Sequence, residues 1–315
     1  MPQTINTNVV SMNAQRNLNM SQNSLAVSMQ RLSSGARVNS AKDDAAGLAI
    51  AERMNTQVRG MNVAIRNAND GISLAQTAEG ALGKIADNLQ RMRELAVQSR
   101  NATNSAGDRD NLQKEFKQLQ AEIDRTVQGT KFNSQALFAS GAATTLSFQV
   151  GAGTASTDRI DVTGALLGGG TAVSAASALA STSASAVQDL ISTVTTNWDG
   201  TNGLAIGGNI SGSTAGTAAS VSQVDDAINI IDKALDAIND KRASFGATQN
   251  RFEAVISNLQ VSVENQAAAR GRIMDADFAA ETANLSRSQI LQQAGTAMVA
   301  QANQLPQQVL SLLKG

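Results

Sequence analysis

Apolar residues between Met54 and Ala96 recur at alternating spacings of three and four, which is typical of one face of a long α-helix. Glu79 and Arg93 interrupt this stripe with polar side chains. The apolar members are Met54, Val58, Met61, Ile65, Ala68, Ile72, Ala75, Leu82, Ala86, Leu89 and Ala96. At about 1.5 Å per residue such a helix is roughly 65 Å long, which is too long to bury itself in an ordinary globule. The stripe therefore predicts a rod that packs against partner helices.

Two further stripes supply those partners. The longer runs from Val224 to Val263 in the same alternation, with Arg242 and Gln249 as its polar interruptions. The shorter covers residues 112–127 and follows a polar turn at 101–110, in which Gly107 is expected to break the helix. Together they predict an antiparallel helical bundle. Four glycines in the first rod indicate close backbone approach between its helices: Gly60, Gly71, Gly80 and Gly83.

Each end of the chain carries a thinner stripe. Apolar residues at steps of three, four and seven mark the first 35 residues, and a seven-residue repeat marks the last 30. The main members are Leu18, Leu25, Met29 and Leu32, and Leu291, Met298, Leu305, Val309 and Leu312. Stripes this thin do not hold isolated helices, so we expect the two arms to pair, with a solvated helix as the alternative. Pro306 predicts a kink or a restart in the C-terminal arm.

Connectors separate the arms from the rods. In residues 33–47, Gly35 is expected to end the first helix, and Ser40 with Asp43 to form a capping box for the next. Residues 270–275 mirror this connector near the other end. Asp43 and Asp44 are also conceivable metal ligands, but adjacent carboxylates at a helix start are far more often capping residues.

Between the rods the periodicity changes. Residues 146–150 and 158–162 alternate with period two around a glycine-containing turn, which predicts a β-hairpin. Residues 163–220 are rich in Ala, Ser, Thr and Gly and are expected to form a small outer domain, with a helix within 175–196 and turns or short strands within 200–216. A long loop is the alternative.

The fold class is therefore mainly α: a long antiparallel helical bundle or coiled coil with a β-hairpin, paired terminal helices and a small outer domain. The expected division has three parts. A terminal coiled-coil domain combines residues 1–40 with 275–315, a helical rod domain combines 41–162 with 222–274, and the outer domain covers 163–221.

Composition narrows the function classes. The 315 residues include 3% aromatic residues, no Cys and no His, and the formal net charge is −1. Without Cys and His the chain cannot form disulfides, Ser–His or Cys–His catalytic sites, or imidazole or thiolate metal sites. A net charge near zero also gives no electrostatic attraction to nucleic acid or an anionic membrane. Neither a signal peptide nor a membrane span is expected from the apolar pattern. We predict no enzyme activity, no cofactor and no metal, although a carboxylate enzyme or a lectin within 163–220 is conceivable.

Several long motifs closely resemble bacterial flagellin. They occur in the family's order and cover about residues 1–162 and 222–315, leaving the middle segment, which varies among flagellins, without a signature. The N-terminal motifs are Arg31-Leu32-Ser33-Ser34-Gly35, Asn39 to Gly47, Arg66 to Ser73, Glu79-Gly80-Ala81-Leu82 and Gln90 to Ser99. The C-terminal motifs are Ser286 to Gly295 and Leu305 to Leu313.

The resemblance implies a structural protein that is exported unfolded by the flagellar type III apparatus and polymerises into the extracellular helical filament used for motility. Its implied partners are further copies of itself, hook-junction and cap proteins, and an export chaperone that binds the C-terminal arm. The terminal stripes would then be polymerisation surfaces. A hook–filament junction protein is the alternative.

The resemblance also implies recognition by the innate immune receptor Toll-like receptor 5. The matching residues are Gln90, Arg91 and Leu95 on the first rod, with Glu115 on the following helix. An exposed Arg beside Leu and Glu suits an interface hot spot. Alternatively, Arg91 and Leu95 serve packing between subunits.

Overall fold

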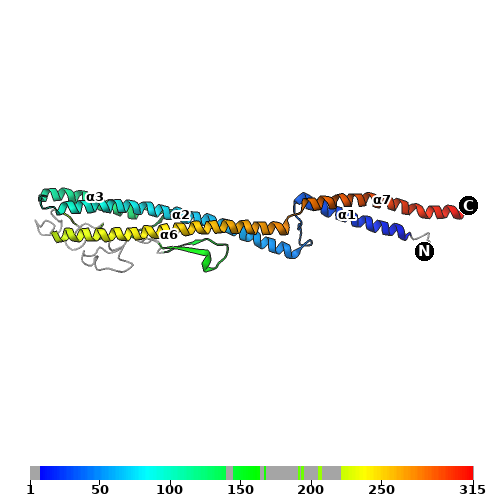
Figure 1. The fold of residues 1–315 in the computed structure, drawn as a ribbon, viewed down its shortest axis with the longest axis horizontal. Helices are drawn as coiled ribbons and strands as arrows, with labels where there is room; N and C mark the ends of the chain where they lie inside the picture. The colour runs from blue at the N-terminus through cyan, green and yellow to red at the C-terminus, as the bar shows by residue number, and fades with distance from the viewer. Residues whose placement is uncertain are drawn as a thin grey trace. The chain divides into compact units, whose positions relative to one another are not determined.

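The structure is a computed structural model that describes residues 8–139, 145–163, 167, 191, 193–194, 205–207 and 221–314, with the side chains of α7 described as far as Gln304. The described elements are, in chain order, α1 (Val9–Ser34), α2 (Ala45–Arg100), α3 (Ala106–Gly129), β1 (Lys131–Phe132), β2 (Gln135–Ala136), β3 (Thr145–Gln149), η1 (Ser156–Asp158), β4 (Arg159–Thr163), α6 (Val221–Met274) and α7 (Phe278–Lys314). The mainly helical fold class predicted from the stripes is confirmed (Figure 1).

The chain divides into two compact units. One contains Met1–Arg59 with Ser262–Gly315, and the other contains Gly60–Val261. The first unit thus combines the two ends of the chain, and the second is one continuous segment. The three-part division expected from the sequence stays a prediction.

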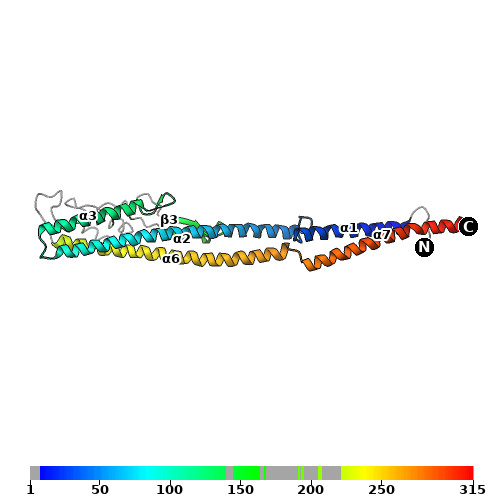
Figure 2. The ribbon, with the colours of Figure 1, turned by 90° about the horizontal axis from the view of Figure 1, so that it is seen from above.

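In the second unit, α2, α3 and α6 run side by side, and Figure 2 shows the same arrangement from above. The α2 stripe is buried from Met61 onward at Ala68, Ala75, Leu82, Ala86, Leu89 and Ala96. The α6 stripe contributes the buried Val224, Ile231, Ile238, Phe245 and Phe252, and α3 contributes Phe116, Ile123 and Val127. At roughly 1.5–3 kcal/mol for each large apolar side chain, this core is the main source of stability in the unit.

Two of the polar residues that interrupt the long stripes, Glu79 of α2 and Gln249 of α6, form a hydrogen bond with each other. The Gln249 amide donates a 3.0 Å hydrogen bond to the Glu79 carboxylate, so one interruption of α2 meets one of α6. A polar pair across a seam satisfies both groups and favours one register over its neighbours.

The glycines of α2 only partly match the expectation of close approach. A Cβ added at Gly60 would lie 2.8 Å from Ala152 Cβ, and one at Gly71 would lie 2.6 Å from Phe252 Cζ. Additions at Gly80 and Gly83 would meet nothing within 4 Å. Of the four, Gly71 alone allows close approach of another helix, through the Phe252 side chain of α6; Gly60 makes room for Ala152 in the hairpin turn, and the prediction is wrong for Gly80 and Gly83.

The predicted hairpin is present. Strands β3 and β4 pair antiparallel with Phe148 opposite Ile160. The hairpin is attached to the bundle through the Asn67 amide, which donates to the Gln149 carbonyl at 3.0 Å, and through Phe148, whose ring meets Phe252 edge-on at 5.5 Å. The small sheet therefore extends the core formed by α2 and α6.

A second hairpin, β1 with β2, was not predicted. Its two-residue turn is Asn133-Ser134, and both residues have positive φ, at 48° and 65°. Turns of this kind match the twist of the flanking strands, and Asn is among the residues that tolerate them. The Asn in a short polar pair was the available sequence signal.

Two predicted helix starts are corrected. Helix α2 begins at Ala45 rather than after Ser40, because the Asp44 carboxylate accepts from the Gly47 backbone N–H at 2.7 Å and caps the helix. Helix α3 begins before Gly107, because Ser105 and Asp108 form a capping box there. The end of α1 is as predicted, since Gly35 adopts the left-handed conformation with φ of 69°.

Asp43 has a local role instead. Its carboxylate accepts from the Ser40 hydroxyl at 3.0 Å and from the backbone N–H groups of Asn39 and Ser40. These bonds, the hydroxyl's first, lower the pKa of the Asp43 carboxyl. Asp43 therefore orders the connector turn and does not cap α2.

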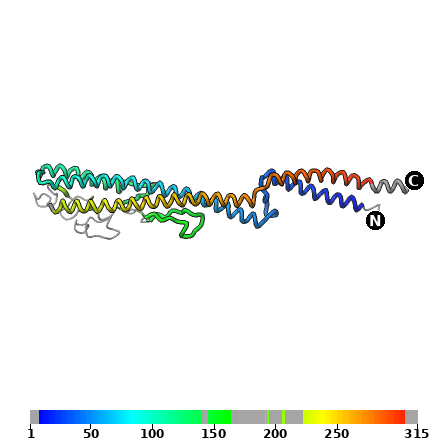
Figure 3. The backbone as a smooth tube through the Cα atoms, in the orientation of Figure 1, coloured from blue at the N-terminus to red at the C-terminus, as the bar shows by residue number. Residues whose placement is uncertain are grey.

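Helix α7 is continuous from Phe278 to Lys314, so it does not restart at Pro306. Figure 3 traces the backbone of the described part of α7 beside α1. The helix predicted within 175–196 and the turns or strands predicted within 200–216 lie largely outside the described residues. The described residues within these two ranges, including Ile191, Val194 and Ile206, are buried.

Polar side chains of α2 and α3 hold two described parts of the outer region. The Gln113 side-chain oxygen accepts from the backbone N–H groups of Ile206 and Gly207 at 2.7 and 3.2 Å, and the Ser99 hydroxyl donates to the Ile206 carbonyl. The Gln120 amide donates to the Val194 carbonyl at 2.6 Å. Sequence reasoning missed this attachment, because Ser and Gln on a helix ordinarily face solvent.

Candidate assembly and recognition surfaces

The contact between α1 and α7 uses small and polar side chains. Ser11 and Ser28 of α1 are buried, as are Ser288 and Ala302 of α7. At Gly295 an added Cβ would come within 3.1 Å of Leu18 Cδ1, so the glycine allows close approach. We call this contact the terminal seam.

Hydrogen bonds close one end of the terminal seam. The Ser11 hydroxyl donates to the Asn303 side-chain oxygen at 2.7 Å, and the Asn8 amide donates to the Ala302 carbonyl at 2.7 Å. The Asn8 side-chain oxygen also accepts from the Ser11 backbone N–H and caps α1. The pairing of the two arms therefore depends on polar bonds as well as on apolar burial.

Large apolar side chains lie outside the terminal seam. Val9, Met12, Met20 and Val27 of α1 are 63%, 56%, 60% and 41% exposed. At 100° per residue these four positions fall within about a quarter of the helix circumference, which makes them one stripe beside the seam rather than within it. On α7 the exposed apolar residues are Phe278, Ile290, Leu291 and Met298. Exposed stripes of this kind are uncommon in monomeric proteins and mark interaction surfaces.

The predicted polymerisation residues divide between these two environments. Leu18, Leu25 and Leu32 are half-buried, whereas Met29, Leu291 and Met298 are at least half exposed. Leu305, Val309 and Leu312 belong to α7, but their side chains lie outside the described part. At seven-residue intervals on α7, Glu281, Ser288 and Ala302 are buried and Gly295 is half-buried, whereas Leu291 and Met298, the described members of the predicted repeat, are exposed. Contact of the predicted residues with neighbouring copies stays a prediction.

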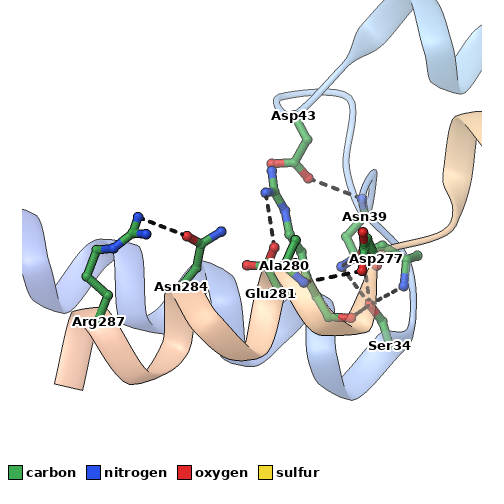
Figure 4. Close-up of polar contacts among 10 residues, drawn as sticks. Ser34, Asn39, Asp43, Asp277, Ala280, Glu281, Asn284 and Arg287 are labelled. Atoms are coloured by element: carbon green, nitrogen blue, oxygen red, sulfur yellow. Dashed lines mark hydrogen bonds and ion pairs between the residues drawn. The ribbon is translucent and has the colours of Figure 1, made fainter. Parts of the chain in front are cut away.

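A groove of 810 Å³ runs along one side of the terminal seam. Met20, Val27 and Leu291 contribute apolar side chains to its lining, and Arg31 and Glu281 contribute charges. The Arg31 guanidinium lies 3.9 Å from the carboxylate of Glu281, which is largely buried. Figure 4 shows Glu281 on the same helix as Asn284 and Arg287. The other lining residues are Asn, Ser and Arg, so the groove is mainly polar, with three apolar side chains and an ion pair.

The two connectors meet beside this groove. The Arg37 backbone N–H donates to the Met274 carbonyl at 2.6 Å, and the Ala276 N–H donates to the Gly35 carbonyl at 2.9 Å. The Arg37 guanidinium adds a bond to the Ile273 carbonyl at 2.8 Å. The mirrored connectors expected from the sequence are therefore joined backbone to backbone.

The residues predicted for receptor recognition lie on α2 and α3. Arg91 donates to Glu94 and to Glu115, each at 2.8 Å, and these two carboxylates, Glu94 first, raise the pKa of Arg91. Gln90 is exposed, and the Arg91 and Glu115 side chains remain 48% and 44% accessible. Leu95 departs from the expected surface position, because its side chain is fully buried.

Two ion pairs join α2 to α6 at matching intervals. Arg93 lies 2.6 Å from Asp232, and Arg100 lies 2.7 Å from Asp225. The partners on each helix are seven residues apart, as expected for flanking positions of an antiparallel coiled coil. The sequence analysis noted Arg93 as a polar interruption and predicted no partner for it. The matching seven-residue spacings, Arg93 to Arg100 on α2 and Asp225 to Asp232 on α6, were the signal that could have revealed the pairing.

No group of three His, Cys, Asp or Glu side chains within the described ranges could hold a metal ion. In the same part of the chain no helix has the length and apolarity needed to cross a bilayer.

Comparison with known proteins identifies the family. A model described as the bacterial flagellin N-terminal helical region matches residues 5–144, and one described as the bacterial flagellin C-terminal helical region matches residues 228–313. The chain belongs to the bacterial flagellin family. Flagellins are structural subunits of the extracellular flagellar filament, as the resemblance implied.

Individual flagellins match along nearly the whole chain. Flagellin of Xenorhabdus nematophila is 45% identical over 315 residues, covering 100% of both chains. Flagellin of Halalkalibacterium halodurans is 43% identical over 310 residues, covering 98% of this chain and 99% of its own. The hook–filament junction alternative is not favoured, because full-length relatives at this identity are flagellins. Among solved structures, Bacillus cereus flagellin is 28% identical and covers 65% of this chain and 94% of its own, with a TM-score of 0.42.

Proposed function

We propose that this chain polymerises into the helical flagellar filament used for motility, and that α1 and α7 bury their exposed apolar residues against neighbouring copies. The observation that carries the proposal is the terminal seam, in which small and polar side chains hold the pair while large apolar residues remain outside. In the isolated subunit the apolar side chains of Val9, Met12, Met20 and Val27 remain in contact with water. Clustered exposure of this kind usually marks an interaction surface. Repetition of one such non-closing contact generates a helix of subunits.

The same features support export in an unfolded state. The terminal seam buries few large side chains, so the arms gain little free energy from pairing alone. Arms that unfold easily suit passage through the narrow channel of a type III apparatus. Before passage, an export chaperone binds the C-terminal arm. Assembly at the filament end then involves cap and hook-junction proteins, and the finished product is extracellular. The role is structural and needs no catalysis.

Polymerisation by an α1 variant tests this proposal. Met20→Glu introduces a charge into the exposed stripe. If Met20 is buried between subunits, the lost burial of about 1.5–3 kcal/mol raises the critical concentration for polymerisation about tenfold or more. The measurement is the protein left in the supernatant after sedimentation of filaments, together with electron microscopy.

Gln22→Glu is the matched control, because Gln22 is also exposed on α1 but lies outside the apolar stripe. Circular dichroism of both monomers establishes that they are equally helical. An unchanged critical concentration for Met20→Glu would contradict burial of the stripe, and failure of the unaltered chain to form filaments would contradict the proposed function itself.

We also propose that Toll-like receptor 5 recognises the surface formed by Gln90, Arg91 and Glu115, with Leu95 supporting it from below. Arg91 presents an accessible guanidinium that is already oriented by two carboxylates. Preorganised arginines lose little freedom on binding, which favours them as hot spots. Because Leu95 is fully buried, its contribution is to hold the α2 surface in position.

Receptor signalling by purified monomer tests this assignment. Arg91→Ala should raise the concentration for half-maximal signalling about tenfold, as hot-spot truncations do. Leu95→Ala should weaken signalling together with folding stability, which falls by about 2–5 kcal/mol when a buried Leu is truncated. Arg125→Ala is the matched control, since Arg125 is an exposed, ion-paired arginine on α3. An unaltered response to Arg91→Ala would reject the assignment.

A further inference from the structure

The methionines of this chain are unevenly distributed between the two units. On α1 and α7, Met12, Met20, Met29 and Met298 are 56%, 60%, 57% and 62% exposed. In the unit formed by Gly60–Val261, Met61 is 6% exposed and Met92 is fully buried. The accessible thioethers of the described residues are therefore concentrated on the helices that carry the proposed polymerisation surface.

The sequence makes methionine the only sulfur in the protein. The chain contains 9 Met and no Cys. A thiolate would ordinarily react first with a peroxide, and oxidation elsewhere would follow. Without one, an oxidant that is selective for sulfur should, among the described residues, react with the four exposed methionines before the half-buried Met54 and Met274 and the buried Met61 and Met92.

We propose that the free subunit carries an oxidation-sensitive surface, in which conversion of Met12, Met20, Met29 and Met298 to methionine sulfoxide blocks polymerisation, and that filaments are protected. The inference rests on the proposed function, because it requires these side chains to be buried between copies. The co-reactant is a peroxide.

The chemistry balances as an oxygen transfer. Hydrogen peroxide delivers one oxygen to the thioether sulfur: an S–O bond forms, the O–O bond breaks, and the second oxygen leaves as water after a proton moves to it. The sulfur is oxidised by two electrons and the peroxide is reduced. Methionine sulfoxide reductases reverse the change, one enzyme for each sulfoxide epimer.

The physical effect on assembly follows from polarity. A thioether is a flexible apolar group that fits irregular contacts between helices. The sulfoxide places a strong hydrogen-bond acceptor at the same position, and burying that acceptor without a donor is unfavourable. Met12 and Met20 belong to the exposed stripe of α1, and Met298 flanks the terminal seam on α7, so several contacts of each subunit are affected together.

The test compares monomers and filaments treated with hydrogen peroxide, which is then removed with catalase. Peptide mass spectrometry measures sulfoxide at each methionine. In monomers the four exposed methionines should oxidise at least about tenfold faster than Met61 and Met92, and in filaments this difference should largely disappear. Treated monomers should lose polymerisation, and reductase with a thiol reductant should restore it.

Two variants locate the effect. In one, the four exposed methionines are replaced by Leu; in the matched control, Met61 and Met92 are replaced by Leu. Each treated sample is compared with its own untreated sample, so that changes in basal assembly cancel. The first variant should be resistant to peroxide and the second should remain sensitive. If a variant fails to assemble untreated, rescue of the unaltered chain by reductase decides the question.

The outcomes separate this inference from the proposed function. If untreated, unaltered subunits form filaments and the subunits oxidised at all four sites do so equally well, the inference is overturned and the proposed function stands. Equal oxidation of the four sites in filaments and monomers also overturns it. If untreated, unaltered subunits form no filaments, the proposed function fails and the inference fails with it.

Discussion

Gly71 of α2 lies directly against the ring of Phe252, and this contact brings the two longest helices together. Phe252 is fully buried and meets Phe148 of the hairpin edge-on, so one glycine supports the junction of α2, α6 and β3. A side chain at this position would displace a ring that is confined on its other side. The absence of a Cβ at Gly71 is therefore a packing requirement.

Gly71→Ala should lower the melting temperature of the monomer. An added Cβ would lie 2.6 Å from Phe252 Cζ, and overpacking of a core typically costs about 1–3 kcal/mol. The gain in helix propensity of about 0.5–1 kcal/mol offsets only part of this cost. Thermal unfolding followed by circular dichroism measures the change.

Gly80→Ala is the control for that substitution, because it lies on the same helix and its added Cβ meets nothing within 4 Å. It should raise the melting temperature slightly through helix propensity alone. If both substitutions shift stability in the same direction, the contact with Phe252 does not have the role assigned to it.

At the scale of elements, polar pairs set the register of α2 against α6. The Arg93–Asp232 and Arg100–Asp225 pairs and the Glu79–Gln249 hydrogen bond follow one antiparallel alignment. Asp232 raises the pKa of Arg93, first through the side-chain hydrogen bond and then through its charge. Exposed pairs contribute little stability, and their main effect is to disfavour shifted alignments.

Charge reversal tests this role. Asp232→Arg places two like charges together and should lower the melting temperature, whereas the double variant Asp232→Arg with Arg93→Asp should recover most of the loss. The penalty of the single variant should diminish in about 1 M salt, where the Debye length falls to about 3 Å. A double variant no more stable than the single one would show that the pair does not couple the helices.

At the scale of the whole chain, the spacing of apolar residues predicted the long helices, but it did not predict where α2 begins or which residues of α7 pack against α1. The stripes of α2 and α6 are long and strongly periodic, so their pairing could be inferred. The start of α2 could not, because Ser40, Asp43 and Asp44 are all good capping residues and only the backbone geometry selects Asp44. Similarly, the leucine repeat of α7 suggested a seam, whereas Gly295 and its small neighbours permit closer approach and occupy that position.

For the proposed receptor surface, too, the sequence did not predict which side chains come together. Arg91 and Glu115 belong to different helices, and the motifs alone do not reveal that they form an ion pair. Leu95 belongs to the same motif as Arg91, but its side chain is buried in the core. A sequence motif does not show which way each side chain points. The attachment of Ile206 by Ser99 and Gln113 was equally hidden, because it joins segments distant in the chain.

The composition of the terminal seam has a thermodynamic consequence. A pair of helices that buries Ser11, Ser28, Ser288 and Ala302 gains little free energy by itself, and each of the proposed contacts with another copy would add to it. Its apparent stability would then obey mass action and increase with protein concentration, as for any species stabilised by a ligand that binds only the folded form. Under the proposed function, the helices at the two ends of the chain act as ligands for one another's folding, in each subunit and between subunits.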